Sequence, residues 1–317
     1  AKPYAYESGR RALQEHADRL GMDVTVEMQE PLGTYRFRRN LTDTPKVSII
    51  IPTRGTTSRV WGVDRNLAVE TVMSVLEKES YPNLEFVVVV DRPTPALVIT
   101  ALERLLGDRL TLVWYDEKFN FSKKMNIGAA HATGDLLLML NDDMQVITED
   151  FLSTMVPIAL DPEIGMVGGK LYFADGTLQH AGHVYNGDPY HAMFRWSGDE
   201  LGPSGLLVVQ RECIGVTAAC ALLRMDVFDE VGGMTPLLHS NFNDVDFSFK
   251  IRNAGYRIVW TPYVEMYHFE SQTREPTPTD YEHMVIRHRW SDRLYGDPYY
   301  NPNLAPFRDD WVERALR

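Results

Sequence analysis

Apolar residues along this chain fall into two patterns: short uninterrupted runs, and segments with the spacing of a helix. Each run is typical of a strand that is buried on both faces. The runs cover residues 47–51, 86–90, 110–115 and 136–140. The segments of helical spacing lie at residues 66–78, 96–106, 122–132 and 149–160. Strands that alternate with helices predict an α/β fold, with a mostly parallel central sheet flanked by helices.

Polar side chains follow three of these runs, at residues 53–54, 91–92 and 141–143. In a parallel sheet these turns meet at one edge, where the ligands of open α/β folds bind. Asp142 and Asp143 are adjacent carboxylates, which repel each other unless a cation or donor groups offset them. The stretch therefore indicates a divalent metal that carries a phosphorylated ligand. A polar turn that caps the next segment is the alternative.

Composition and charge narrow the classes of partner. The chain has 317 residues and a formal net charge of −12, which argues against broad nucleic-acid binding because that needs a basic face. Its two cysteines fit a reducing compartment, and neither a signal peptide nor a membrane-spanning run is evident. We expect a cytoplasmic protein, with peripheral association at the inner face of the plasma membrane as an option. A sequence without an initial Met also fits a piece of a larger multidomain chain.

A second informative stretch covers residues 241–256. Phe247, Ile251 and Ala254 have helical spacing, and Asp244 falls at the amino end of the predicted helix. A carboxylate there can cap the helix and gains from the helix dipole. Capping accounts for one aspartate, and less well for Asp244 and Asp246 together.

Residues 179–196 are rich in His, Tyr and Trp. Aromatic loops beside a sheet edge suit the recognition of a sugar by stacking and by hydrogen bonds to its hydroxyls, with His180, His191 and Trp196 as candidates. Ordinary packing under long loops is the alternative for each of them. His180 and His183 without a third ligand are weak evidence for a zinc site.

Taken in order, these stretches resemble an inverting family 2 glycosyltransferase with the GT-A fold. Residues 47–53 (Val-Ser-Ile-Ile-Ile-Pro-Thr) are similar to its first strand and nucleotide loop, and residues 119–128 to the segment before its metal motif. Residues 141–143 stand where the family carries DxD, residues 243–246 where it carries its ED motif, and His268 where it carries a late metal-binding histidine. Asn141 and Asn243 depart from the acidic residues of these two motifs.

The resemblance extends over most of the chain and implies its organisation. The parts are an N-terminal extension and linker at residues 1–45, a GT-A glycosyltransferase domain at 46–275 (a nucleotide-binding half at 46–145 and an acceptor and catalytic half at 146–275) and a C-terminal helical tail at 276–317. Residues 178–182 and 268–271 resemble a branch associated with bacterial surface polysaccharides, including rhamnosyl- and hexosyltransferases.

The resemblance also implies roles for single residues. Asp244 is the expected catalytic base, and Asp143 and His268, with Asn141, are the expected ligands of Mn²⁺ or Mg²⁺. The expected donor is a nucleoside diphosphate sugar of the UDP or dTDP type, and the expected acceptor a glycan or a lipid-linked glycan. The donor-binding candidates are Pro52, Thr53, Arg54, Asp91, Lys123, Asn126, Asp142 and Arg274. The acceptor candidates are His180, His191, Trp196 and Asp246.

Two other classes of protein share part of this pattern. A sugar nucleotidyltransferase would normally carry a basic, glycine-rich loop after the first strand, and residues 52–57 contain a single glycine. A non-catalytic carbohydrate-binding module of a larger polymerising enzyme needs no set of Asp143, Asp244 and His268. The combination therefore favours an active transferase.

Overall fold

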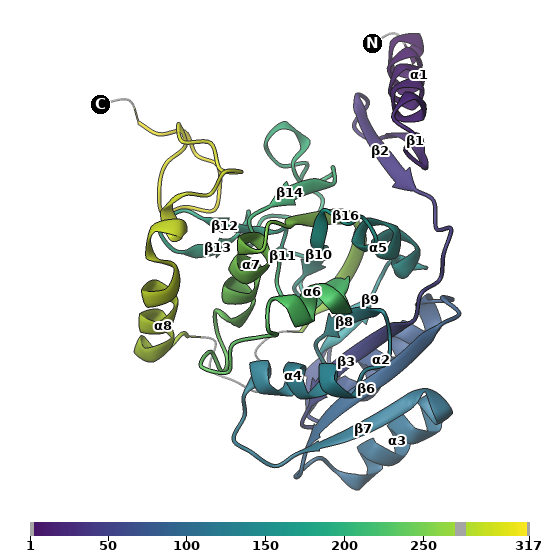
Figure 1. Ribbon diagram of the computed structural model, residues 1–317, viewed down its shortest axis with the longest axis vertical. Helices are drawn as coiled ribbons and strands as arrows, with labels where there is room; N and C mark the ends of the chain where they lie inside the picture. Colours follow the sequence, from purple (N-terminus) through teal and green to yellow (C-terminus); the bar gives the residue numbers. More distant parts are fainter. Residues whose placement is uncertain (1–2, 270–276, 316–317) are drawn as a thin grey trace.

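A ten-stranded mixed sheet forms the centre of the computed structural model, which describes residues 3–269 and 277–315 (Figure 1). The strands follow the order β14-β16-β10-β15-β8-β3-β6-β7, with β11 paired to β10 and β9 to β16. They are β3 (Val47–Thr53), β6 (Leu84–Asp91), β7 (Leu110–Tyr115), β8 (Leu136–Leu140), β9 (Met144–Val146), β10 (Ile164–Tyr172), β11 (Leu178–His180), β14 (Arg211–Cys213), β15 (Cys220–Arg224) and β16 (Arg257–His268).

The parallel part of the sheet, β8-β3-β6-β7, confirms the predicted fold class. Ile49 of β3 pairs with Phe86 on one side and Leu138 on the other, and β3 and β8 are buried along their whole length. Apolar runs without polar interruption suit strands covered on both faces. Beyond β8 the sheet becomes mixed, because β15 runs antiparallel to both β8 and β10.

Helices cover both faces of this sheet (Figure 1). One core joins α2, α3 and α5 to Ile49 and Ile51 of β3, and the other joins α4, α6 and α7 to Ile50. This division follows from the alternation of side chains along a strand. The helices are α2 (Leu67–Lys78), α3 (Ala96–Leu106), α4 (Phe121–His131), α5 (Phe151–Ala159), α6 (Met225–Glu230) and α7 (Asn243–Asn253).

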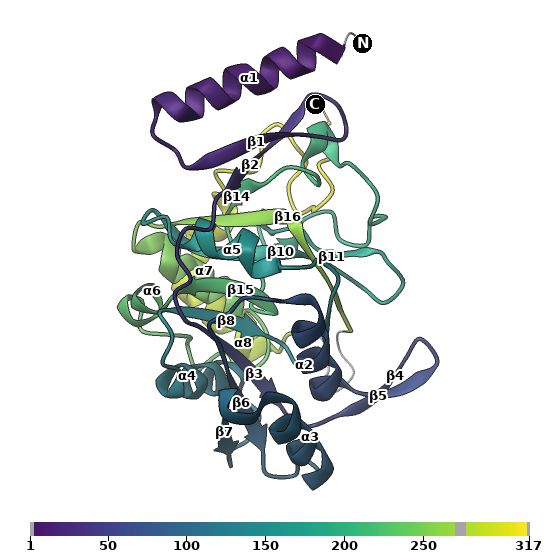
Figure 2. The same cartoon turned by 90° about the vertical axis from the view of Figure 1, so that its right-hand side faces the viewer.

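The N-terminal extension stands at one end of the molecule (Figure 2). Its helix α1 (Pro3–Arg19) packs on a hairpin of β1 (Val24–Gln29) and β2 (Thr34–Arg39). Two arginines of β2 tie the hairpin to the main domain. The Arg36 guanidinium donates to Thr154 Oγ1 at 3.0 Å, and that of Arg39 donates to Asp161 Oδ2 at 2.7 Å.

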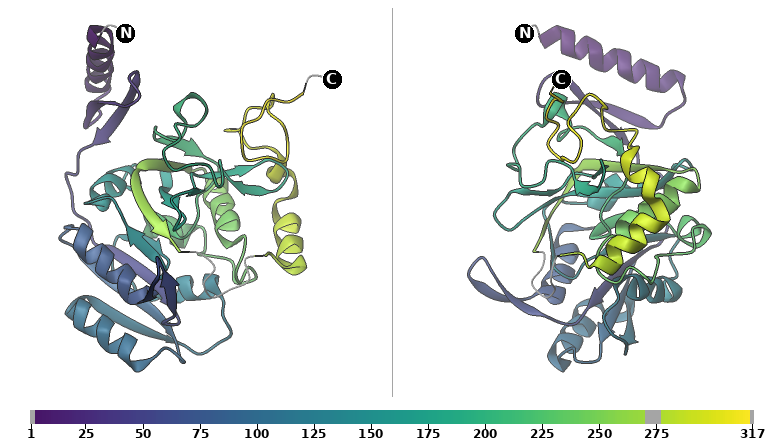
Figure 3. Two further views of the ribbon diagram at one scale, coloured as in Figure 1. Left: turned by 180° about the vertical axis from the view of Figure 1, so that it is seen from behind. Right: turned by 90° about the vertical axis from the view of Figure 1, so that its left-hand side faces the viewer.

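The C-terminal tail packs on the domain through helix α8 (Asp280–Trp290), which lies beside α7 (Figure 3). The 3-10 helix η3 (Ser291–Tyr295) continues α8. Beyond η3 the tail forms main-chain hydrogen bonds with the segment that follows β11. The Met193 N–H donates to the Asp309 carbonyl, and the Phe307 N–H donates to the Asn186 carbonyl. None of the described helices has both the length and the apolar character needed to cross a membrane.

Two hairpins differ from the sequence prediction. The hairpin β4 (Thr57–Val60) and β5 (Val63–Asn66) was not predicted, and neither was the pairing of β12 (His183–Tyr185) with β13 (Pro189–His191). The strand β16 also contains a proline, Pro262, in its interior. A shift of register against β10 around Pro262, between the pairs Gly168–Trp260 and Lys170–Glu265, accommodates the proline within the strand.

Candidate active site

A cavity of about 790 Å³ is lined by residues from several separate elements of the chain. Its wall combines residues from the turn after β8, the amino end of α7, the end of β16 and the β12–β13 hairpin. These include Asn141, Gln179, His183, His191, Asp244 and His268, together with Trp61, Phe194 and Arg195. Candidate residues that lie up to 127 positions apart in sequence therefore share one concave surface, which is the usual shape of a site for a small ligand.

Three predicted metal ligands lie in contact at one side of this cavity. Nε2 of His268 is 3.0 Å from Nδ2 of Asn141 and 3.1 Å from Oδ1 of Asp143. Nδ1 of the same ring is 2.5 Å from Oε1 of Gln179. An amide oxygen only accepts, so Nδ1 carries the proton of the neutral ring and Nε2 directs its lone pair at the two other side chains.

This trio fits a divalent cation. Within the described ranges 3–269 and 277–315, the buried Oδ1 atom of Asn141 accepts no hydrogen bond. An imidazole lone pair and a carboxylate oxygen face each other at 3.1 Å, an arrangement that a cation between them would stabilise. Carboxylate, amide and imidazole donors together suit Mn²⁺ or Mg²⁺.

Sheet pairing brings these residues together. β9 runs antiparallel to β16, and His268 pairs with Met144, next to Asp143. The Phe269 N–H donates to the Asp143 carbonyl at 2.9 Å, and the Asn141 N–H donates to that of Ala219 at 3.0 Å. Backbone bonds thus fix the turn after β8 on both of its sides.

Asp142 makes a different contact from its two neighbours. Oδ2 of Asp142 accepts from the Thr53 hydroxyl at 2.5 Å. Burial, followed by the adjacent Asp143 carboxylate, raises the pKa of Asp142 to about 7. Thr53 ends β3, so this bond connects the predicted nucleotide loop to the predicted metal turn.

Lys124 is a functional candidate that the sequence analysis missed. Its ammonium lies 2.7 Å from Asp91 Oδ1 and donates to the Thr53 carbonyl at 3.2 Å. The side chain is 1% exposed, and its burial lowers the pKa of Lys124 while Asp91 opposes that change. Helical spacing was the available signal, since Lys124 shares the buried face of α4 with Gly128. Lys123 is exposed and pairs with Glu117.

Asp244 lies in the first turn of α7 and lines the cavity. Its Oδ2 is 3.8 Å from Nε2 of His183, and the Val245 N–H donates to its Oδ1 at 2.8 Å. Burial lowers the pKa of His183 to about 3, although Asp244 opposes that shift, so the ring is neutral. Phe242 occupies the N-cap position of α7 without a side-chain cap bond, so Asp244 is not the N-cap residue, although it accepts from one free N–H of the first turn.

Other predicted site residues have structural partners. Asp246 is fully buried and accepts from Arg289 Nε at 2.6 Å and Trp290 Nε1 at 2.7 Å, which holds α8 on α7. Asn126 bonds both main-chain groups of Met234. Pro52 is buried in β3, and Arg54 is exposed. Trp196 packs against the core that contains Ile50, and Arg274 lies outside the described residues.

The mostly parallel sheet flanked by helices has the architecture of the GT-A fold. A mannosyltransferase from Pyrobaculum calidifontis, PcManGT, solved with GDP-Man and Mn²⁺, superposes with a TM-score of 0.52 at 18% identity, covering 92% of this chain and 71% of its own. GalNAc-T7, solved with UDP, GalNAc and Mn²⁺, superposes with a TM-score of 0.62 at 14% identity, covering 93% and 58%. At such identities the similarity shows the fold alone.

Residues 45–292 match the family described as "Glycosyltransferase like family 2", so the chain belongs to the family 2 glycosyltransferases. Protein y4gI of Sinorhizobium fredii, an uncharacterized protein, is 39% identical over all of this chain and 35% of its own length. The O-antigen biosynthesis protein RfbC of Myxococcus xanthus is 35% identical over 95% of this chain and 23% of its own length. The chain thus spans about a third or less of these relatives.

Proposed function

We propose that this domain is a metal-dependent inverting glycosyltransferase of the hexosyl or rhamnosyl type. It moves a sugar from a nucleoside diphosphate sugar, of the UDP or dTDP type, to a hydroxyl of a glycan or lipid-linked acceptor in bacterial cell-surface polysaccharide synthesis. The observation that carries the proposal is one cavity lined by Asp244, Asn141 and His268, with Asp143 in contact with the His268 ring.

Asp143, His268 and Asn141 would hold Mn²⁺ or Mg²⁺. The bound cation supplies Lewis acidity for the negative charge of the leaving diphosphate. The Mn²⁺ bound in both of the similar solved structures supports this assignment. Asp91, held by Lys124, borders the base of the nucleotide, and the loop from Pro52 to Arg54 borders the rest of it.

Asp244 acts on the acceptor. Its Oδ2 takes the proton of the acceptor hydroxyl while that oxygen bonds to the anomeric carbon and the bond to the diphosphate breaks. A single displacement of this kind inverts the anomeric configuration. The neutral His183 ring, 3.8 Å away, places no positive charge beside this carboxylate.

The compartment and the wider context belong to the same proposal. Cys213 and Cys220 are free and buried, which fits the cytoplasm, and a lipid-linked acceptor would be reached at the inner face of the plasma membrane. The O-antigen role of RfbC supports a place in surface polysaccharide synthesis, as one part of a larger chain.

Thermal stability with a panel of nucleoside diphosphates, each with and without Mn²⁺, tests donor binding. A ligand at about a hundred times its dissociation constant stabilises the fold by about 2.7 kcal/mol. A shift that needs both Mn²⁺ and one nucleotide supports the transferase and identifies the base. Absence of any shift in folded protein would favour a non-catalytic module.

Turnover of Asp244→Asn tests the base. A general base contributes about 10²–10⁴-fold, so turnover falls by about that factor while the nucleotide shift is retained. Asp229→Asn, an exposed aspartate on α6, is the control and keeps full turnover. Unchanged turnover in Asp244→Asn would refute the base assignment, and release of diphosphate instead of nucleoside diphosphate would indicate a nucleotidyltransferase.

A further inference from the structure

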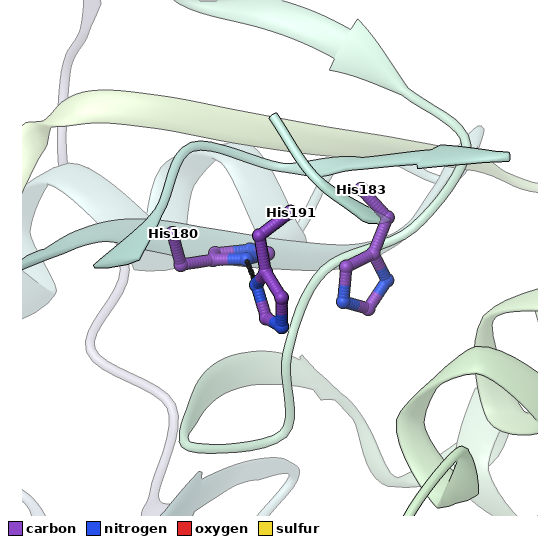
Figure 4. Close-up of side chains that lie close together, drawn as sticks. All are labelled: His180, His183 and His191. Carbon is purple, nitrogen blue, oxygen red and sulfur yellow. Dashed lines mark hydrogen bonds between the residues drawn. The ribbon is translucent and has the colours of Figure 1, made fainter. Parts of the chain in front are cut away.

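Three histidines, His180, His183 and His191, form a cluster (Figure 4). Two of them, His183 and His191, line the cavity together with Asp244. One ring nitrogen of each lies within 4.8 Å of a ring nitrogen of both others. Such a group invites assignment as a metal site. The hydrogen bonds around the rings decide what the cluster can do, because a ring nitrogen binds a metal only through a lone pair.

The buried His180 ring has a defined tautomer. Main-chain N–H groups of Gly182 and Thr217 point at its Nε2, at 3.3 and 3.2 Å. Main-chain amides only donate, so Nε2 holds a lone pair and the proton of the neutral ring is on Nδ1. Burial, followed by the neighbouring His191 and His183 rings, keeps the pKa of His180 well below its ordinary value.

The backbone imposes this arrangement on His180. His180 pairs with Leu171 of β10, which fixes its position in the sheet. Gly182 has a φ of +85°, which turns its N–H back towards the ring, and only glycine adopts that backbone without strain. The backbone of residues 178–182 therefore holds the His180 imidazole in a single tautomer.

The tautomer of His180 sets that of His191. The two Nδ1 atoms lie 2.8 Å apart, and a dashed line joins them in Figure 4. Two nitrogens at this distance share one hydrogen, and His180 supplies it. Nδ1 of His191 is thus the acceptor, and the proton of the neutral His191 ring is on Nε2.

We infer that His180 is the positioning residue that sets the Nε2–H tautomer of His191, and that this N–H donates a hydrogen bond to a hydroxyl oxygen of the acceptor sugar when the acceptor enters the cavity that His191 lines. The nature of the ligand rests on the proposed function, whereas the two tautomers do not. The three histidines do not suit a metal ion, because His180 has no lone pair to offer one. Its Nε2 lone pair faces two main-chain N–H groups, and its Nδ1 carries the proton.

Long-range ¹H–¹⁵N NMR of histidine-labelled protein tests the tautomers without any substrate. The nine histidine rings are assigned from single variants. His180 is expected as the Nδ1–H form and His191 as the Nε2–H form. A cationic His180, or His180 as the Nε2–H form, would overturn the inference.

Matched variants test the role of His191. In His191→Gln the amide nitrogen reaches the place of Nε2, whereas His191→Leu has no donor. Loss of one hydrogen bond in a closed site corresponds to about tenfold, so the KM for the acceptor rises by about that factor in His191→Leu and much less in His191→Gln. Equal acceptor KM values in the two variants of an active enzyme would refute the role.

The positioning role of His180 has its own pair of variants. His180→Asn keeps an N–H near the place of Nδ1 and is expected to keep His191 in its Nε2–H form, while His180→Leu releases it. Methyl rhamnoside and methyl glucoside are the acceptor probes, and binding is read from the His191 ¹⁵N signals, which works without turnover. A visible Co²⁺ absorption band that His191→Leu abolishes and His268→Ala leaves intact would show a metal site instead.

Discussion

The buried carboxylate of Glu85 on β6 allows a direct test of how much one charged group contributes to the stability of this fold. Lys46 Nζ lies 2.5 Å from its Oε2, the Ser48 hydroxyl donates to Oε1 at 2.5 Å, and Thr133 donates through its N–H at 2.6 Å and its hydroxyl at 2.8 Å. These bonds join β3, β6 and the segment before β8. Burial alone would raise the pKa, and the four bonds outweigh it and lower the pKa of Glu85 to about 2.

The size of the effect follows from this pKa. A fall from 4.5 to about 2 is worth about 3 kcal/mol in the ionised form, and about 2 kcal/mol after allowance for solvent around Lys46. The folded state has the lower pKa, so this stability is complete above about pH 4.5 and is lost as the pH falls towards about 2. Glu85→Gln should therefore cost about 2 kcal/mol at neutral pH and progressively less below about pH 4.5.

Urea unfolding followed by tryptophan fluorescence, from about pH 7 down to about pH 3.5, measures this difference. Glu103→Gln, at an exposed carboxylate of α3, is the control and is expected to match the wild type throughout. A difference between Glu85→Gln and wild type that stays constant over the whole range would show that packing, and not charge, is what the substitution removes.

Three further predictions concern the site and its supports. Lys124→Met leaves the Asp91 carboxylate without its ammonium partner, and we expect it to lower the free energy of unfolding by about 3–5 kcal/mol. The double variant Lys124→Met/Asp91→Asn should lose less of that free energy, and equal losses in the two variants would refute the coupling. Asp246→Asn weakens the bonds to Arg289 and Trp290 and is expected to lower stability by about 2 kcal/mol in calorimetry. His268→Ala should abolish the Mn²⁺-dependent part of the nucleotide thermal shift; an intact metal dependence would exclude His268 as a ligand.

Elements with uninterrupted apolar runs or regular helical spacing were predicted closely. The bounds of β7, β8 and α3 agree with the prediction residue by residue, because polar residues flank the apolar runs of β7 and β8, and Pro95 and Gly107 flank α3. The β4–β5 hairpin was missed because Val60 is its only buried residue while Trp61 and Val63 are exposed, so burial imposes no alternating pattern on it. Its Trp61 Nε1 nevertheless donates to the Ala174 carbonyl and closes one side of the cavity.

Some residues of the candidate site could be predicted from the sequence, and others could not. The turn at 141–143 and the start of α7 were predictable, because acidic residues at the ends of buried elements stand out in a sequence. The choice between Lys123 and Lys124 was not, since only the packing of α4 on β3 determines which ammonium reaches Asp91. Asp246 was equally conspicuous in the sequence, but in the structure its carboxylate binds Arg289 of α8.

The sequence by itself determined the α/β class, the family resemblance and the type of chemistry, because these depend on residue types and on local periodicity. The tertiary structure decided which of those residues meet. His268 reaches Asp143 through the pairing of β9 with β16, and His191 reaches His180 through a hairpin held by the C-terminal tail. Such contacts join positions far apart in the chain, and their geometry depends on strand register and packing, which local patterns do not specify.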